Sequence, residues 1–480
     1  MDSRRILLLL VLLGACAPSD NGSAPVAVDY AITDANVIDV ERARVLSEQT
    51  ILIKGNRIVA AGPADLVSLP SDVPARDARG KYLIPGLWDM HAHVLFEGMN
   101  GYLTLLIANG VTGIREMGNS PIPLEEIHRI RGEILAGDRL GPRFIASGVL
   151  VDGPESRWTD GVALADSPER GRAIVDSLAS AGADFIKVYN YLRPEVYRAI
   201  VDAAAARQIS VAGHVPYLVT ALEASEANQR SFEHLVGVDQ ACSTQEESLI
   251  AISREQLDAI ADGDTTAESR SERQWWDRLL ATHDAARCRG VLERLARNRT
   301  WQTPTLVNIQ KKCVDPAVLT SDDRLSYVPT HVRDWWNDAM PAQRDHISVQ
   351  NQARCRLRMS LVSSMERVGV PLLAGSDAAN PFVIWGFSLH DELLLMVEAG
   401  LSPLQALRTA TLNPARFLEA TDSLGKVERG MIADLVLLDG NPLDDIRNTR
   451  KIAAVVLNGR YLDREELDLL LAETAPAIAR

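Results

Sequence analysis

The chain has 480 residues, of which 46% are apolar and 24% are charged, so it can bury a large core and is not a disordered polypeptide. Its formal net charge is −14 at pH 7, and no basic cluster or zinc-finger spacing offsets this charge, which argues against a nucleic-acid partner. The length favours one large domain with a small second one.

The N-terminus has the pattern of an export signal. Two arginines precede an apolar run over 6–13 that is too short to span a membrane as a mature helix, and small residues followed by Cys16 close it. This segment resembles a bacterial lipoprotein signal, which implies a signal peptide over 1–15 and a lipid anchor on Cys16. Ala17 is not acidic, which favours the outer membrane, facing the periplasm, and 16–28 predicts a tether. The alternative is an ordinary secretory leader in which Cys16 is incidental.

Short strand-like runs stand at both ends of the chain. They are separated by turns such as Lys54-Gly55-Asn56 and Asn458-Gly459. The runs are 30–38, 49–53, 57–62 and 81–84 near the start, and 435–438 and 452–457 near the end. We expect one small β-sandwich domain built from 29–85 and 424–465, followed by a C-terminal tail over 466–480.

His91 and His93 follow an apolar run that ends in Pro-Gly. In an extended strand, residues i and i+2 point to the same face, so both imidazoles can reach one cation. The alternative for this pair alone is chance proximity, with one ring packed in the core.

Further ligand types end later strand-like runs. Lys187 lies inside an apolar stretch, where a charged amine is costly to bury unless it is used. His214, His234 and Asp377 each close a run of their own. Individually, a strand-end aspartate often caps a helix, a histidine can be a hydrogen-bonded structural residue, and a lysine can pair with a glutamate. Their joint occurrence favours a metal site.

The central part of the chain alternates strand-like runs with helical patterns. Besides the strand that carries His91 and His93, the runs are 111–115, 143–147, 185–188, 211–214, 232–234, 302–307 and 372–376, which makes eight. Two connections, at about 240–300 and 310–365, are about twice as long as one helix and two loops require. We expect these insertions to form a lid, with the pairs Trp275-Trp276 and Trp335-Trp336 either as anchors into the core or as substrate platforms.

Four cysteines remain after Cys16, namely Cys242, Cys288, Cys313 and Cys355. An even number in an exported protein permits two disulfides. Similar positions in consecutive strand-helix units favour the pairs Cys242–Cys313 and Cys288–Cys355, and the alternative is four buried free thiols.

Several motifs together are similar to those of one enzyme family. They are Pro-Gly-Leu-Trp-Asp-Met-His-Ala-His at 85–93, Gly-Val-Thr-Gly-Ile-Arg-Glu at 110–116, Ala-Thr-Leu-Asn-Pro-Ala at 410–415 and Gly-Met-Ile-Ala-Asp-Leu-Val at 430–436. On these motifs the chain resembles the metal-dependent amidohydrolase superfamily, in its imidazolonepropionase-like and prolidase-like branch with a two-metal site. The resemblance and the count of eight runs imply an α/β fold, a (β/α)₈ TIM barrel over 86–423 with its functional groups at the C-terminal ends of the strands.

The resemblance also implies the ligand set. His91, His93 and Asp377 would bind one metal, His214 and His234 the other, and Lys187 would bridge them as a carbamate. A buried lysine near cations can become a neutral amine and add carbon dioxide. The ligand types suit zinc and could also accept manganese or cobalt.

The implied chemistry is hydrolysis by a hydroxide that bridges the metals, with Asp377 as general base and then general acid. The absence of a Gly-x-Ser-x-Gly elbow gives no support to an acyl-enzyme. We expect a small amide substrate, either a dipeptide or an N-acyl amino acid. The alternatives are esterase, lactonase or phosphotriesterase activity at the same site, or a non-catalytic surface lipoprotein, and a homo-oligomer is left open.

The sequence offers fewer candidates for substrate contacts than for metal ligands, and the support for each is weaker. Tyr189 and Tyr217 lie two or three residues beyond a ligand, with core packing or a turn as their alternatives. Arg115 is a third candidate, or else it forms a structural salt bridge with Glu116, where relatives more often carry aspartate. His390 is expected to be structural.

Overall fold

The computed structural model describes residues 28–96, 99–264, 266–339 and 349–478. The predicted signal peptide, the predicted lipidation site Cys16 and all of the predicted tether before residue 28 lie outside these ranges. Within the described ranges, the helices are too short or too polar for any of them to cross a membrane.

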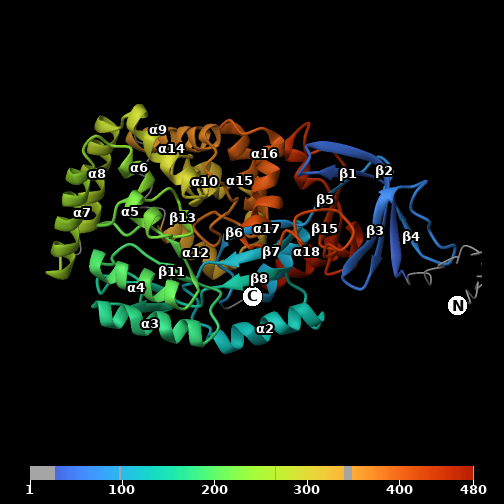
Figure 1. Ribbon diagram of the computed structural model, residues 1–480, viewed down its shortest axis with the longest axis horizontal. Coiled ribbons are helices and arrows are strands. Elements are labelled where there is room, and N and C mark those ends of the chain that lie inside the picture. The colour runs from blue at the N-terminus through green and yellow to red at the C-terminus, as the bar shows by residue number, and fades with distance from the viewer. Residues whose placement is uncertain (1–27, 97–98, 265, 340–348, 479–480) are drawn as a thin grey trace, which may run out of the picture.

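Both chain ends contribute strands to one eight-stranded sheet, at the right of Figure 1. Its strands are β1 (Tyr30–Asp39), β2 (Arg44–Lys54), β3 (Arg57–Pro63), β4 (Ala75–Asp77), β5 (Tyr82–Pro85), β15 (Leu435–Leu438), β16 (Ile452–Leu457) and β17 (Arg460–Asp463). The order is β17-β16-β15-β5-β1-β2-β3, with β4 beside β1. The two ends of the chain meet where β5 pairs antiparallel with β15.

Alternation of apolar residues explains the buried face of this sheet. Ile51 and Ile53 on β2 are two residues apart, so both side chains point to the same face, where they pack with Leu83 and Leu435. The contribution of both ends is as predicted, whereas the division into two sandwich layers stays a prediction.

Two further sheets are entirely parallel. One has the order β6-β7-β8, and the other has the order β10-β9-β11-β12-β13-β14. Their strands are β6 (Leu87–Ala92), β7 (Val111–Glu116), β8 (Arg143–Ala146), β9 (Leu150–Asp152), β10 (Val162–Leu164), β11 (Phe185–Val188), β12 (Ser210–Gly213), β13 (Ser231–Glu233) and β14 (Trp301–Thr303).

The extended segment 370–378 connects these two sheets. Leu372 bridges Gln302 of β14, and Ala378 bridges Ala92 of β6, both in parallel orientation. Met90 N–H donates to Ala374 O at 2.9 Å, which adds a hydrogen bond to β6. The architecture is therefore TIM-barrel-like α/β, while a fully closed ring of eight regular strands stays a prediction.

Two expected strands differ in the structure. The run 372–376 forms isolated bridges rather than a regular strand. The run 302–307 leaves the sheet at Thr303, because Thr305 adopts a left-handed backbone (φ 48°) and helix α10 (Leu306–Lys311) begins directly after it. An apolar run alone does not show where a strand turns into a helix.

Helices follow the parallel strands, as the alternating pattern predicts. They are α1 (Met99–Ala108), α2 (Leu124–Ala136), α3 (Pro168–Ser180), α4 (Pro194–Ala206) and α5 (Ala221–Glu226). Helix α4 buries Val196, Ile200 and Ala204, which are four residues apart and therefore share one face. Ser167 caps α3 by accepting the Arg170 N–H.

Both insertions are helical. The first contains α6 (Val238–Ala241), α7 (Glu246–Ala261), α8 (Ala267–Thr282) and α9 (Ala285–Arg297), and the second contains α10, α11 (Pro316–Thr320), the 3₁₀ helix η1 (Asp323–Tyr327), α12 (Thr330–Ala339) and α14 (Val349–Val368). In Figure 1, α7 and α8 lie at the end of the molecule opposite β1 to β4. Trp276 and Trp336 are buried anchors, whereas Trp335 is 51% exposed.

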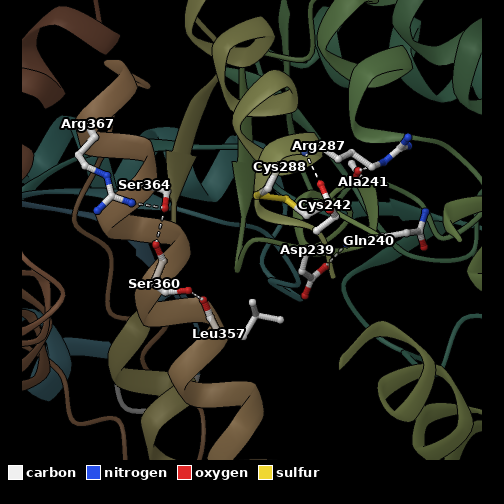
Figure 2. Close-up of a disulfide and its surroundings, with 11 residues drawn as sticks. Asp239, Gln240, Ala241, Cys242, Arg287, Cys288, Leu357, Ser360, Ser364 and Arg367 are labelled. Carbon is white, nitrogen blue, oxygen red and sulfur yellow. Dashed lines mark hydrogen bonds between the residues drawn. A yellow bond between two sulfur atoms is a disulfide. The ribbon is translucent and has the colours of Figure 1, made fainter. Parts of the chain in front are cut away.

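All four cysteines of the described chain form disulfides, but the predicted pairing and the free-thiol alternative are wrong. The bonds are Cys242–Cys288 and Cys313–Cys355. Figure 2 shows the first, which joins the end of α6 to α9, where Arg287 Nε also donates to Ala241 O at 2.8 Å. Each bond joins helices that pack together, and the sequence spacing did not reveal this packing.

The C-terminal part adds α15 (Phe387–Glu398), α16 (Pro403–Thr409), α17 (Leu412–Phe417), η2 (Ile446–Arg450) and α18 (Arg464–Ile478). The segment expected to be a tail therefore forms a helix, and α18 packs against α1.

Candidate metal centre

One cavity of about 900 Å³ is lined by all six predicted ligands. His91 lies within β6, Lys187 lies within β11, and Asp377 lies in the bridging segment 370–378. His214 and His234 directly follow β12 and β13. Parallel strands end at the same edge, which is why residues almost 300 positions apart meet there.

His91, His93 and Asp377 form the tightest group. The Nε2 atoms of His91 and His93 lie 3.3 and 3.4 Å from Asp377 Oδ1. One ligand atom from each of the three lies within 4.8 Å of the others, a spacing at which they could hold a single cation. His214 and His234 lie beside this group, with ring centroids 4.8 Å apart, and the centroid of His234 lies 4.6 Å from that of His91.

Each of the four histidines has a hydrogen-bond partner at Nδ1. These partners are Glu233 Oε2 for His91 (2.9 Å), Gly118 O for His93 (2.9 Å), Asn190 Oδ1 for His214 (2.6 Å) and Thr305 Oγ1 for His234 (2.6 Å). A partner at one ring nitrogen fixes the ring orientation and leaves the other nitrogen for a metal. The donor set therefore fits a metal centre.

The electrostatics suit cation ligands. Burial is the main cause that lowers the pKa of His91 and of His214 well below the usual value, and it lowers that of His234 to about 4. Burial opposes ionisation of Asp377, yet His234 and His91 outweigh it and hold the pKa of that carboxyl below its usual range. Neutral imidazoles and an ionised carboxylate are the forms that bind metals.

Lys187 lies among these groups and is 2% exposed. Burial lowers the pKa of its amine to about 8, against the opposing attraction of Glu233 and Asp377. Within the described ranges, no hydrogen bond or ion pair engages this amine. A buried, unpaired amine of low pKa that faces the ligands fits the predicted carbamate.

Arg115 does not line the cavity, in contrast to its predicted role as a substrate contact. It lies behind the ligands, where its Nη2 donates to both oxygens of Glu233 at 2.9 Å, and it does not pair with Glu116. Burial opposes ionisation of Glu233, but Arg115 and His91 hold its pKa well below the usual range. Arg115 thus fixes the carboxylate that orients His91.

Sequence reasoning missed Glu233 and Asn308. Glu233 stands between Phe232 and His234, and a charge inside so short an apolar run was the available signal. Asn308 on α10 donates through Nδ2 to Asp377 Oδ2 at 2.6 Å. No sequence signal marked it, because its approach depends on where α10 begins.

Glu116 lines the cavity beside His93. Its Oε1 lies 3.7 Å from His93 Nδ1, and its Oε2 accepts the Val94 N–H at 2.7 Å. Burial raises the pKa of Glu116 to about 7.

Three residues at the site have left-handed backbone angles. His234, Thr305 and Asp377 have φ angles of 59°, 48° and 64°, in the left-handed region that non-glycine residues seldom adopt. Gly375 is needed for close packing, because a Cβ there would lie 2.7 Å from His91 Cβ.

Tyr189 and Tyr217 both line the cavity, and the ring of Tyr189 lies 4.2 Å from that of His214. His390 lies elsewhere, buried, with Thr449 Oγ1 and Asn109 O as hydrogen-bond partners. This placement agrees with its expected structural role.

A family comparison connects this geometry to known proteins. The model of the amidohydrolase family matches residues 82–462, which is well over half of the chain. The chain belongs to the amidohydrolase family. The predicted family membership is confirmed.

Several solved structures share the fold. Bottromycin amidohydrolase is 24% identical with a TM-score of 0.72, and the match covers 94% of this chain and 90% of that one. A putative prolidase from Bifidobacterium longum is 23% identical with a TM-score of 0.64, covering 93% and 100%. A Xaa-Pro dipeptidase with bound methionine is 20% identical with a TM-score of 0.65, covering 90% and 99%.

Two curated relatives match only locally. Adenine deaminase 2 from Bradyrhizobium sp. (strain ORS 278) is 34% identical over 108 residues, which are 21% of this chain and 18% of that protein. Adenine deaminase 2 from Jannaschia sp. (strain CCS1) is 41% identical over 69 residues, which are 14% and 11%. This amidohydrolase thus spans less than a fifth of either relative.

Proposed function

We propose that this protein is a metal-dependent hydrolase of a small amide, either a dipeptide or an N-acyl amino acid. The observation that carries the proposal is the convergence of His91, His93, Lys187, His214, His234 and Asp377 on one cavity. The similar structures include a putative prolidase and a Xaa-Pro dipeptidase, which favours a peptide-type amide over other carbon–nitrogen bonds.

The residues present would hold two divalent cations. His91, His93 and Asp377 would bind one, His214 and His234 the other, and Lys187 as a carbamate would bridge them. Zinc suits this set of nitrogen and oxygen ligands. When bound, the cations would activate a water molecule and polarise the scissile carbonyl.

The chain's own groups would then move the proton. Ionised Asp377 accepts a proton from the attacking water as the new carbon–oxygen bond forms, and it donates this proton to the nitrogen as the carbon–nitrogen bond breaks. Asn308 orients the carboxylate through Oδ2. Arg115 and Glu233 hold His91 in place during both steps.

We also propose that the enzyme is exported and anchored by a lipid on Cys16. Two disulfides in the described chain suit an oxidising compartment, which supports export.

A substrate screen tests the proposed activity. Zinc-loaded protein is assayed against dipeptides and N-acyl amino acids, before and after chelation. Simple esters, lactones and phosphotriesters are assayed separately as alternative substrates. We expect amide hydrolysis that chelation removes and zinc restores. Preferred turnover of the oxygen esters would overturn the amide assignment. Purified protein that holds no metal and turns over no substrate would instead support the alternative of a non-catalytic surface lipoprotein.

A further inference from the structure

One cation of the cavity wall, besides Lys187, has no ion-pair partner among the described residues. Besides Lys187, the described cavity-lining cations are Arg157, Lys312, Arg354 and Arg358. The three arginines each face a carboxylate of the same wall: Glu268 for Arg157 (3.8 Å), Glu272 for Arg354 (3.0 Å) and Asp239 for Arg358 (3.1 Å). Among the residues that the structure describes, Lys312 has no ion-pair or hydrogen-bond partner for its amine.

Lys312 is also placed near the reacting groups. It stands four residues after Asn308, so both lie on the same side of α10, about 6 Å apart along the helix axis. Asn308 contacts Asp377, and both Asn308 and Lys312 line the cavity. Lys312 therefore belongs to the part of the cavity wall that adjoins the proposed proton shuttle.

The position of Lys312 is fixed by its neighbour. Cys313 is bonded to Cys355 of α14, and the Cys313 carbonyl accepts Gln352 Nε2 at 2.7 Å. The end of α10 is thus held at two points, so the lysine is presented from a rigid support rather than from a free loop.

The surroundings favour an anion at this point. Lys312 lines the cavity with an exposed side chain, and the charge of Arg358 repels its ammonium form. An incoming carboxylate would offset this repulsion by stabilising the ammonium form.

We propose that Lys312 binds the free carboxylate of the substrate and so selects amides that carry one negative charge. This inference rests on the proposed function, because it names the substrate group that the same cavity recognises. A charge-assisted hydrogen bond of this kind changes affinity by about 10- to 100-fold.

The test compares two substrates and three variants. The substrates are the best dipeptide of the screen and the same dipeptide with its terminal carboxylate reduced to an alcohol. The variants are Lys312→Ala, Lys312→Arg and, as a matched control, Lys311→Ala, because Lys311 is the adjacent lysine of α10 and does not line the cavity.

For the dipeptide, we expect Lys312→Ala to raise KM about 10- to 100-fold with kcat within about threefold, and Lys312→Arg to restore most of the loss. The dipeptide alcohol should respond less than about twofold, and Lys311→Ala should match the wild type with both substrates. Equal losses on both substrates, or no loss on the dipeptide, would overturn the role of Lys312.

Failure of the proposed function would look different. In that case the wild type hydrolyses no dipeptide of the screen, and each dipeptide and its alcohol counterpart can be titrated calorimetrically without turnover. Selective loss of dipeptide binding in Lys312→Ala would still support the carboxylate site, and unchanged binding would refute it.

Discussion

At the scale of single residues, the centre depends on how tightly each ligand is oriented. Every histidine has a partner at Nδ1, and Asp377 is held from one side by Asn308 while His91 and His93 approach its other oxygen. Such support restricts the ligands to one geometry, which lowers the reorganisation needed for metal binding.

Asp377→Asn tests the proton shuttle. The amide keeps an oxygen toward His91 and His93 but cannot accept and return a proton. We expect kcat to fall by at least about 10³-fold while most of the metal remains bound, as measured by steady-state kinetics and elemental analysis of the same sample. Retained activity would refute the shuttle.

Gly375→Ala tests the close packing beside His91. The new methyl group would lie within 2.7 Å of both Thr303 Cγ2 and His91 Cβ, so a neighbour must move, at a cost of about 1–3 kcal/mol in the free energy of unfolding. We expect lower metal occupancy and a lower melting temperature.

The matched control is Gly132→Ala in the interior of α2, where an added Cβ meets open space. This change should leave metal occupancy unchanged and increase stability by up to about 1 kcal/mol. Equal effects of the two substitutions would contradict the packing account.

At the scale of elements, helix α10 has a central place because it carries Asn308 and Lys312. Its first turn is held by Glu392 of α15, whose Oε2 accepts the Val307 N–H at 2.7 Å. Its last turn is held by the Cys313–Cys355 disulfide.

We expect the substitution Glu392→Gln to change how the free energy of unfolding depends on pH. Burial raises the pKa of Glu392 to about 8 from a usual value of 4.5, so this side chain is uncharged in the folded protein between these two values but ionised in the unfolded chain. Unfolding releases a proton there, so the wild type loses stability as pH rises, by at most about 1.4 kcal/mol per pH unit.

Glutamine lacks this titration and keeps an acceptor for Val307. The stability advantage of Glu392→Gln over the wild type should therefore grow from pH 5 to pH 8 in chemical denaturation. The exposed Glu398 of the same helix provides the control, since Glu398→Gln should show no such trend. A constant difference across this range would contradict the account for Glu392.

The sequence predicts elements well where one local pattern decides them. The strand that carries His91 and the run around Lys187 form β6 and β11, because strands of buried parallel sheets are rich in apolar residues. The left-handed turn at Thr305, which separates β14 from α10, has no comparable signal in the sequence. The disulfide pairing and the position of Asn308 depend on helix packing in the insertions, which periodicity does not encode.

At the scale of the whole molecule, the ligand set was predictable because strand ends of one parallel architecture converge. Five residues that are far apart along the chain therefore line one cavity, namely His91, Lys187, His214, His234 and Asp377. Arg115 also lies near the end of a parallel strand, yet its side chain contacts Glu233 and does not line the cavity. The sequence pattern does not show which of these two directions a side chain takes.

Cys16→Ser tests the proposed anchor. Without the thiol no lipid can be attached, so the variant should move from the membrane fraction to the soluble periplasmic fraction and lose labelling by radioactive palmitate, with its hydrolytic activity unchanged. Continued membrane association with no palmitate label in the wild type would contradict the lipoprotein proposal.

The most direct test of the central claim is the metal content of purified wild type and of Lys187→Ala, measured by elemental analysis after growth with zinc. The account predicts about two metal ions per wild-type chain and a clearly lower content in the variant, because the bridging group is lost. A full complement of metal in Lys187→Ala, or a metal-free wild type, would contradict it.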